Sequence, residues 1–231
     1  LNYSAGLEYR TPTKVKDISI ELLNAGHIPG SAQILVKNKN KCVLYTGDFN
    51  SIDTRLLEKA DQYKDKVDAL VIESTYATED HPDRLSLEKE FLDSILDVLE
   101  RGGTVLIPAF SVGRSQEILC TLVANHLEYP ITIDGMAKDV SEIFMRYPTY
   151  VRDNRLLMNA LHEANWVHGW RDRRLASKKF GVIISPAGML KGGAAMYYMN
   201  ILTKKVENAI FLVSYQVPGT PGRALLDTKE F

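Results

Sequence analysis

Three side chains suited to metal binding or acid–base chemistry stand at the ends of short apolar runs. His27 follows the alternating run Ile18–Leu23, Asp48 follows Cys42–Tyr45, and Glu73 closes the run that begins at Asp68. A continuous apolar run is typical of a strand buried on both faces, and functional residues often lie in the loop that follows a strand. One imidazole and two carboxylates form a ligand set that zinc accepts. The pattern therefore predicts a polar site at one edge of a sheet.

Each of the three also has a simpler explanation. His27 follows a glycine and could be an ordinary turn residue. Gly47-Asp48 is common turn chemistry, because an aspartate accepts hydrogen bonds from the backbone amides that follow it. Glu73 precedes a Ser-Thr pair that could cap a helix. The recurrence of all three at strand ends favours a shared site.

The composition is that of an ordinary folded protein. The chain has 231 residues, of which 45% are hydrophobic and 25% charged, and its net charge is −1. It is long enough for one large or two smaller domains, and binding of nucleic acid would need a local basic surface. No apolar run approaches the roughly 18 residues of a membrane span. Cys42 and Cys120 lack the spacing of a metal or redox motif, which favours a reduced, cytoplasmic protein.

The first third of the chain has the pattern of strands and loops. The alternation over Val15–Leu23 predicts a strand after an irregular start. Two further runs, Ile34–Lys37 and Lys41–Tyr45, flank Asn38-Lys39-Asn40, and this turn signal predicts a β-hairpin. Ser51–Tyr63 is expected to be a short helix or an irregular loop.

From Thr78 the pattern changes to alternating helices and strands. Apolar spacing predicts helices over Leu85–Arg101, Ser115–Leu127, Lys138–Tyr147 and Ala194–Thr203, and strands over Thr104–Phe110, Ile131–Asp134, Lys179–Ser185 and Ala209–Tyr215. Strands separated by helices imply right-handed crossovers and a mostly parallel, Rossmann-like sheet. The predicted fold class is α/β, with a boundary near Ala77–Asp83 between a domain of residues 1–77 and a second of residues 78–231.

A series of motifs, in this order, resembles the β-CASP branch of the metallo-β-lactamase superfamily, which acts on nucleic acids. The motifs are GHIPGSA at 26–32, YTGDF at 45–49, ESTY at 73–76, IPAFSVGRSQE at 107–117, SPAGMLKGG at 185–193 and SYQVPGTPGR at 214–223. They are similar to those of archaeal and eukaryotic cleavage-and-polyadenylation endonucleases and of related RNA-processing exonucleases. The resemblance implies part of an αββα metallo-β-lactamase sandwich at 1–77. At 78–231 it implies an inserted Rossmann-like β-CASP domain, incomplete at its C-terminal end.

The resemblance also implies roles for the three side chains. In the family, two zinc ions lie in a cleft between the two domains. His27 would then ligate one metal, Asp48 would bridge both, and Glu73 would orient a later histidine that acts as the general acid. Such a centre activates water and stabilises the attacking and leaving oxygens in phosphodiester hydrolysis. Asp48 and Glu73 are thus the implied catalytic residues, and single-stranded RNA is the implied substrate.

Two small-residue loops of the second domain are candidates for binding substrate phosphate. Ser111 and Arg114 lie between a predicted strand and a predicted helix, where free amides and the helix dipole suit an anion. Arg114 could add a bidentate contact, or it could pair structurally with Glu117. Ser185 begins a second such loop after its strand.

The chain departs from the family at both ends. The HxHxDH signature and two later histidines have no counterpart, so His27 and Asp48 alone cannot complete a zinc site. The chain begins at Leu1, and we expect an internal piece of an active nuclease that is itself inactive and binds little zinc. A non-catalytic scaffold subunit of an RNA-cleavage complex and a DNA-directed nuclease are the alternatives. A second copy of the chain or other processing-complex subunits are further expected partners, and a membrane is not.

Overall fold

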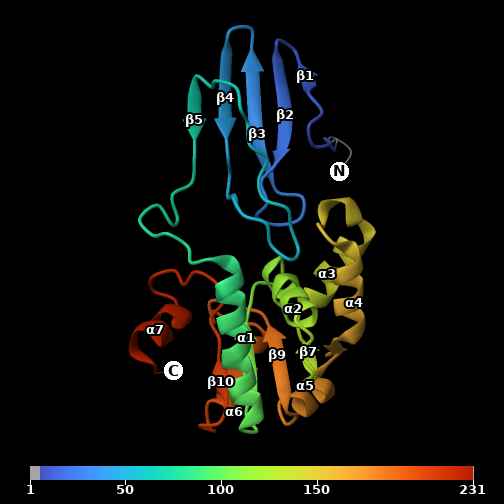
Figure 1. The fold of residues 1–231 in the computed structure, drawn as a ribbon, viewed down its shortest axis with the longest axis vertical. Helices are drawn as coiled ribbons and strands as arrows, with labels where there is room; N and C mark the ends of the chain where they lie inside the picture. Colours follow the sequence, from blue (N-terminus) through green and yellow to red (C-terminus); the bar gives the residue numbers. More distant parts are fainter. Residues whose placement is uncertain (1–5, 231) are drawn as a thin grey trace. The chain divides into compact units, whose positions relative to one another are not determined.

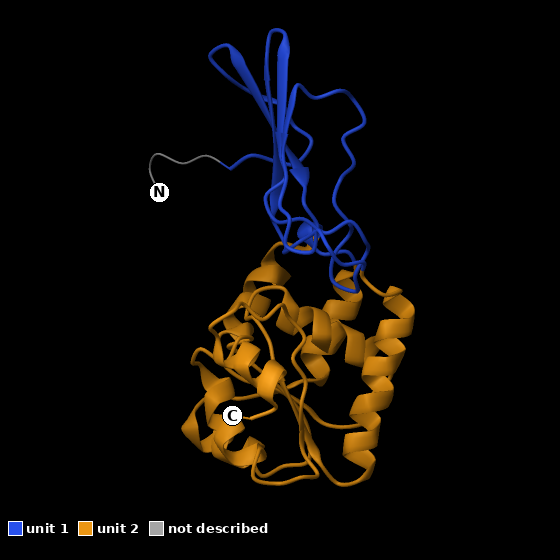
Figure 2. Cartoon of the chain, turned by 90° about the vertical axis from the view of Figure 1, so that its left-hand side faces the viewer, with its two compact units in different colours: residues 1–80, 149–152 blue, residues 81–148, 153–231 orange. Residues whose placement is uncertain are grey.

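The computed structural model describes residues 6–230, which divide into two compact units (Figure 2). Unit 1 runs to Asp80 and also includes the short segment Thr149–Arg152. Unit 2 comprises His81–Pro148 and the residues from Asp153 onward. No pattern in the sequence predicted that a four-residue segment would return to unit 1.

Unit 1 is built on one five-stranded sheet (Figure 1). Its strands, in spatial order, are β1 (Thr13–Val15), β2 (Ile18–Asn24), β3 (Ala32–Asn38), β4 (Lys41–Tyr45) and β5 (Ala69–Val71). All neighbours are antiparallel except β4 and β5, which are parallel. The predicted hairpin is confirmed as β3–β4, and the segment at 51–63 is an irregular loop. The single strand predicted over Val15–Leu23 is instead a hairpin that turns at Lys16, where φ is +57°.

The expectation that the runs before Asp48 and Glu73 are buried on both faces is wrong. A small core of Leu23, Leu35 and Leu44 lies on one face of the sheet. All three residues of β5 are exposed, with Leu70 51% accessible. Between residues 6 and 80 the structure has strands and loops only, so no helix of that segment covers the other face.

Unit 2 contains a five-stranded, fully parallel sheet in the order β10-β6-β9-β7-β8. Its strands are β6 (Thr104–Pro108), β7 (Ile131–Ile133), β8 (Asn165–Trp166), β9 (Gly181–Ser185) and β10 (Ala209–Ile210). Its helices are α1 (Arg84–Glu100), α2 (Arg114–Ala124), α3 (Ala137–Arg146), α4 (Asn154–Glu163), α5 (Trp170–Ala176), α6 (Ala194–Leu202) and α7 (Pro221–Thr228). The 3₁₀ turn η1 (Pro148–Tyr150) leads from unit 2 into the segment Thr149–Arg152 of unit 1. The predicted α/β class and parallel sheet are confirmed, whereas α4, α5, α7 and β8 were not predicted.

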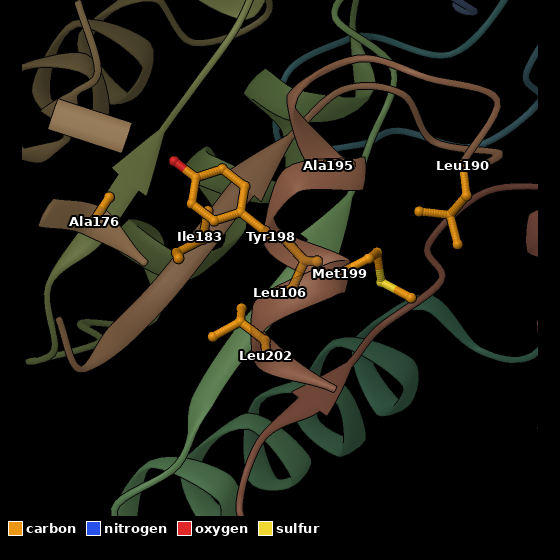
Figure 3. Close-up of a cluster of buried hydrophobic side chains, with 8 residues drawn as sticks. All are labelled: Leu106, Ala176, Ile183, Leu190, Ala195, Tyr198, Met199 and Leu202. Atoms are coloured by element: carbon orange, nitrogen blue, oxygen red, sulfur yellow. The ribbon is translucent and has the colours of Figure 1, made fainter. Parts of the chain in front are cut away.

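The core of unit 2 lies against the two central strands. Every residue of β6 and β9 is buried, so helices cover both faces of the sheet. Figure 3 shows one side of this core, where Leu106 of β6 and Ile183 of β9 pack with Tyr198 and Met199 of α6. No helix in the described part of the chain is long and apolar enough to cross a membrane.

A buried polar network joins three elements of the same unit. Asp134 follows β7 and accepts two hydrogen bonds from the Arg173 guanidinium of α5, at 2.6 and 2.8 Å. The hydroxyl of Tyr198 donates to the same carboxylate at 2.8 Å. Burial, and then the Asp134 carboxylate, holds the pKa of Tyr198 above its usual value. The phenol therefore stays a donor, and the network ties β7, α5 and α6 together.

Candidate functional site

Three loops of unit 1 meet at one edge of its sheet. β3 runs antiparallel to β4, so the start of β3 lies beside the end of β4, with Ile34 opposite Tyr45. β5 runs parallel to β4, which sets Val71 opposite Tyr45 at the same edge. The loops that carry His27, Asp48 and Glu73 therefore open at one place, as the strand-end pattern predicted.

His27 and Asp48 lie next to one another. The Nε2 atom of His27 is 3.7 Å from Oδ2 of Asp48, and their side chains are 47% and 72% exposed. Ser31 fixes the His27 loop, because its Oγ accepts from the amides of His27 and Ile28 at 3.2 Å each. Both side chains are open to solvent, so they can receive a metal or a substrate.

The loop that carries His27 requires a glycine at position 26. The φ of Gly26 is +66°, and a Cβ there would come within 2.7 Å of the Ala60 backbone nitrogen. The amide of Asn50 in turn donates to the Ala25 carbonyl at 2.9 Å, which links the loop after β4 to the His27 loop. A backbone hydrogen bond thus contributes to holding the two loops together.

Glu73 binds the backbone beside Asp48. Its Oε1 accepts from the Phe49 amide at 2.9 Å, and its Oε2 accepts from the Thr75 hydroxyl at 2.7 Å. Burial raises the pKa of the carboxyl, but the hydrogen bonds from Thr75 and Phe49 outweigh it, and the pKa lies below its ordinary value. Glu73 is therefore an ionised acceptor at neutral pH. Thr75, which the sequence analysis considered only as part of a helix cap, is its partner.

The metal-binding capacity of this edge is partial. His27 and Asp48 are ligand-type side chains at compatible positions, and Glu73 already uses both oxygens. Within residues 6–230 no group of three or more histidine, cysteine, aspartate or glutamate side chains is arranged to hold a metal ion. A catalytic zinc usually takes three protein ligands. The described residues therefore provide part of a ligand set.

The loop between β6 and α2 in unit 2 is rigidly built. The carbonyl of Phe110 accepts from the Ser115 hydroxyl at 2.7 Å and from the Ser115 amide. The buried Gln116 amide group donates to the Ser111 carbonyl at 3.1 Å. The amide of Arg114 donates to the Val112 carbonyl, so this helix start has fewer free amides for an anion than the sequence suggested. Any phosphate contact here would depend on side chains, chiefly those of Ser111 and Arg114.

Glu117 lies beside the same loop in a buried ion cluster. The Arg84 guanidinium pairs with Glu117 and, at 2.8 Å, with Glu88, and both carboxylates are more than nine-tenths buried. The sequence analysis considered Arg114 as the structural partner of Glu117 and did not foresee Arg84. A cation 33 residues away in sequence gives no local signal.

Ser185 has a different environment from the one expected. It ends β9, is fully buried, and its carbonyl accepts from the Ala109 amide at 3.0 Å. A hydroxyl without access to solvent is a poor partner for a substrate phosphate.

Comparison with known proteins decides the family. Residues 115–225, which lie within unit 2, match the Beta-Casp domain family. Over 96% of its length the chain is 42% identical to RNase aCSPSF2 of Saccharolobus solfataricus. These findings confirm the predicted resemblance to the β-CASP ribonuclease branch of the metallo-β-lactamase superfamily.

Two further relatives extend the β-CASP comparison. The chain is 41% identical to the probable RNase MJ4 of Methanocaldococcus jannaschii over 99% of its own length. It is 37% identical to transcription termination factor FttA of Pyrococcus horikoshii over 90% of its length. The chain spans 46%, 55% and 35% of these three relatives respectively. The likeness extends through unit 1, although the family match itself starts in α2.

Proposed function

We propose that the whole protein is a zinc-dependent ribonuclease that hydrolyses phosphodiester bonds of single-stranded RNA, and that unit 1 holds part of its active site. The observation that carries this proposal is the pairing of His27 with Asp48, 3.7 Å apart, at a sheet edge where Glu73 binds the amide next to Asp48. Two relatives named as RNases, at 42% and 41% identity, favour RNA over DNA as the substrate.

The residues at this edge fit a zinc site in kind. Nε2 of His27 and Oδ2 of Asp48 would hold the metal, and their separation of 3.7 Å suits two donors each about 2 Å from one ion. When bound, zinc supplies an activated water and stabilises the charge that develops on the phosphate oxygens. Glu73 acts through position, because its carboxylate holds the Phe49 amide and with it the loop that presents Asp48. Further ligands are needed to complete the site.

The proposal also covers the residues that bind RNA, the cellular compartment and the partners. Ser111 and Arg114, at the junction of β6 and α2, are proposed to contact the RNA backbone.

Burial raises the pKa of the Cys120 thiol to about 12, and both cysteines are free, which suits the reducing cytoplasm. A second copy of the protein or other subunits of a processing complex are the proposed partners.

A non-catalytic scaffold is the second candidate function. The observation that favours it is the partial ligand set, since residues 6–230 contain no group of three ligand-type side chains. A scaffold would keep the fold and bind RNA or another subunit while holding no metal. The metal content of the full-length protein distinguishes the two functions.

The test is the substitution Asp48→Ala in the full-length protein. Loss of a metal ligand should lower bound zinc and slow cleavage of a labelled single-stranded RNA by more than about a hundredfold, since even outer-shell partners of a metal reach that range. Asp65→Ala, which removes another exposed carboxylate of unit 1, is the control and should change neither quantity. Wild-type cleavage and zinc content in Asp48→Ala would refute the active-site assignment.

A further inference from the structure

An apolar pocket lies in unit 2 between α3, α4 and β8. It has a volume of about 300 Å³, and its walls include Met145 of α3, Met158 of α4 and Trp166 of β8. The indole N–H of Trp166 donates to the Leu161 carbonyl at 3.1 Å, which fixes the orientation of the ring. A preformed pocket with a fixed aromatic wall suits a flat aromatic group such as a nucleobase.

The polar residues that line this pocket include one lysine, two histidines and one glutamate. Lys138 and His168 lie on its rim, with Nζ of the lysine 3.2 Å from Nδ1 of the histidine. An ammonium group only donates, so Nδ1 is the acceptor in this contact. His162 also lines the pocket, and Glu142 is the acid among its lining residues. Lys138 is therefore held where it can meet a phosphate next to a bound base.

The chain continues from this rim into a basic helix. Residues 168–179 contain five lysines and arginines, namely Arg171, Arg173, Arg174, Lys178 and Lys179, and one acid, Asp172. Arg173 is committed to Asp134, but the other four are exposed. The whole chain has a net charge of −1, so this segment is a local concentration of positive charge. It is the kind of local basic surface that binding of nucleic acid requires.

Trp170 at the start of α5 is exposed, but neighbouring side chains hold its ring in place. Its side chain is 65% accessible, yet the Arg173 guanidinium lies 4.8 Å from its ring centroid and Tyr197 meets it edge-on at 5.7 Å. Arg173 is itself fixed by its two bonds to Asp134. A rigidly backed aromatic ring beside exposed cations is the arrangement on which bases of single strands stack.

We propose that Trp170, the basic face of α5 and the pocket of Trp166, all in unit 2, form a second binding surface for single-stranded RNA that uses other residues than His27 and Asp48 of unit 1. This rests on the proposed function, because it takes RNA as the ligand. His168 on the rim and Trp170 are two residues apart, so their Cα atoms are at most about 7 Å apart. One base in the pocket and another on Trp170 are therefore within reach of one short strand. An acidic protein segment could pair with the basic side chains, but it would not explain the two positioned tryptophan rings.

Both tryptophans of the chain belong to this surface, so intrinsic fluorescence reports on it directly. Titration of the 231-residue chain with a ten-nucleotide oligouridylate should quench the fluorescence in a saturable way. The variant Trp166→Phe leaves Trp170 as the sole reporter and should still be quenched. A phosphodiester decamer without bases should bind much more weakly, because it cannot stack.

Charge variants test the second half of the surface. Arg171→Ala with Arg174→Ala should weaken oligouridylate binding about tenfold and lower the slope of log affinity against log salt by about 1.4, since each phosphate contact on a single strand contributes about 0.7. Lys204→Ala with Lys205→Ala removes two exposed lysines elsewhere in unit 2 and is the matched control. Trp170→Phe should retain most of the affinity that Trp170→Ala loses, which separates stacking from a change in folding.

The outcomes are distinct from those of the nuclease test. Absence of quenching, or equal binding of the base-free decamer, would overturn the second surface. Stronger quenching by a polyglutamate peptide than by oligouridylate would identify a docking site for a protein and would also overturn it. Loss of cleavage in Asp48→Ala bears only on the proposed function, because that residue lies in unit 1.

Discussion

The two sheets of this protein differ in how much of each is covered. In unit 2 every residue of β6 and β9 is buried, and a large cluster of apolar side chains fills the space under α6. In unit 1 the core is small, β5 is exposed throughout, and Tyr45 at the end of β4 is half accessible. The candidate catalytic residues lie on the less covered sheet. Residues that must meet a substrate stay open there, while unit 2 provides most of the buried apolar surface.

The same contrast holds for pairs of polar side chains. Asp134 and Arg173 in unit 2 form a buried, two-point pair, whereas His27 and Asp48 in unit 1 form an open pair with a single approach of 3.7 Å. A buried pair is costly to break because the remaining charge loses its only compensation. An exposed pair contributes little to stability. The open pair is therefore free to serve a ligand.

The largest expected effect comes from breaking the buried pair. Asp134→Ala leaves Arg173 and Tyr198 without their shared acceptor and should lower the free energy of unfolding by about 3–5 kcal/mol. Asp48→Ala should lower it by less than about 1 kcal/mol. Urea denaturation followed by tryptophan fluorescence, which reports on unit 2, and by circular dichroism for the whole chain measures both. Equal costs would contradict the distinction between the two pairs.

A somewhat smaller difference is expected between matched leucines on the two sheets. Leu106 is fully buried in β6, and Leu106→Ala should cost about 3 kcal/mol. Leu70 in β5 is 51% exposed, and Leu70→Ala should cost less than about 1 kcal/mol because little area is lost. The same denaturation curves provide the comparison. A cost at Leu70 as large as that at Leu106 would show that β5 is covered in solution.

The smallest expected effect is an acid dependence carried by Glu73. Its pKa is lower in the folded chain than the ordinary value of 4.5, so the folded state favours the ionised form. The stability from its hydrogen bonds is fully present above that ordinary value and is lost as the pH falls through the lower, folded pKa. Glu73 is only partly buried and solvent screens its interactions, so the gain should be only a few tenths of a kcal/mol.

Glu73→Gln is the variant that tests this dependence. It keeps an acceptor for the Phe49 amide but cannot titrate. Unfolding free energies measured between about pH 5 and pH 3 should therefore fall less steeply than in the unchanged chain. Parallel curves for the two proteins would show that the carboxylate does not carry the effect.

Local patterns predicted much of the fold. The hairpin at Asn38–Asn40 and the helix after Asp83 followed from turn signals and apolar spacing, and both exist. The helix α7 was not predicted, although Thr220 accepts from the Arg223 amide and Pro221 occupies the first turn. The burial of β5 was overestimated because an apolar run cannot show whether a covering layer is present.

The candidate site was predictable to a similar extent. Strand ends brought His27, Asp48 and Glu73 to one edge, because the register of neighbouring strands places them there. The partners of Glu117 and Asp134 were not predictable, since Arg84 and Arg173 are distant in sequence and meet them only through tertiary packing. The burial of Ser185 was not predictable for the same reason, because the neighbouring strand β6, which places Pro108 opposite Ser185, is distant in sequence.

The return of Thr149–Arg152 to unit 1 limits how this protein can be taken apart. The Arg152 amide donates to the Leu56 carbonyl at 2.8 Å, its guanidinium donates to the Thr54 carbonyl at 2.7 Å, and the ring of Tyr150 packs edge-on against Tyr9. A polypeptide that ends at Asp80 would lose these bonds, and one that starts at His81 would carry Tyr150 and Arg152 without their acceptors and packing partner. One of the two units therefore cannot be replaced by a homologous unit with a single crossover in the chain, because unit 1 consists of two separate stretches. If the protein were split, the contacts of Thr149–Arg152 would have to reform to restore the loop that contains Thr54 and Leu56.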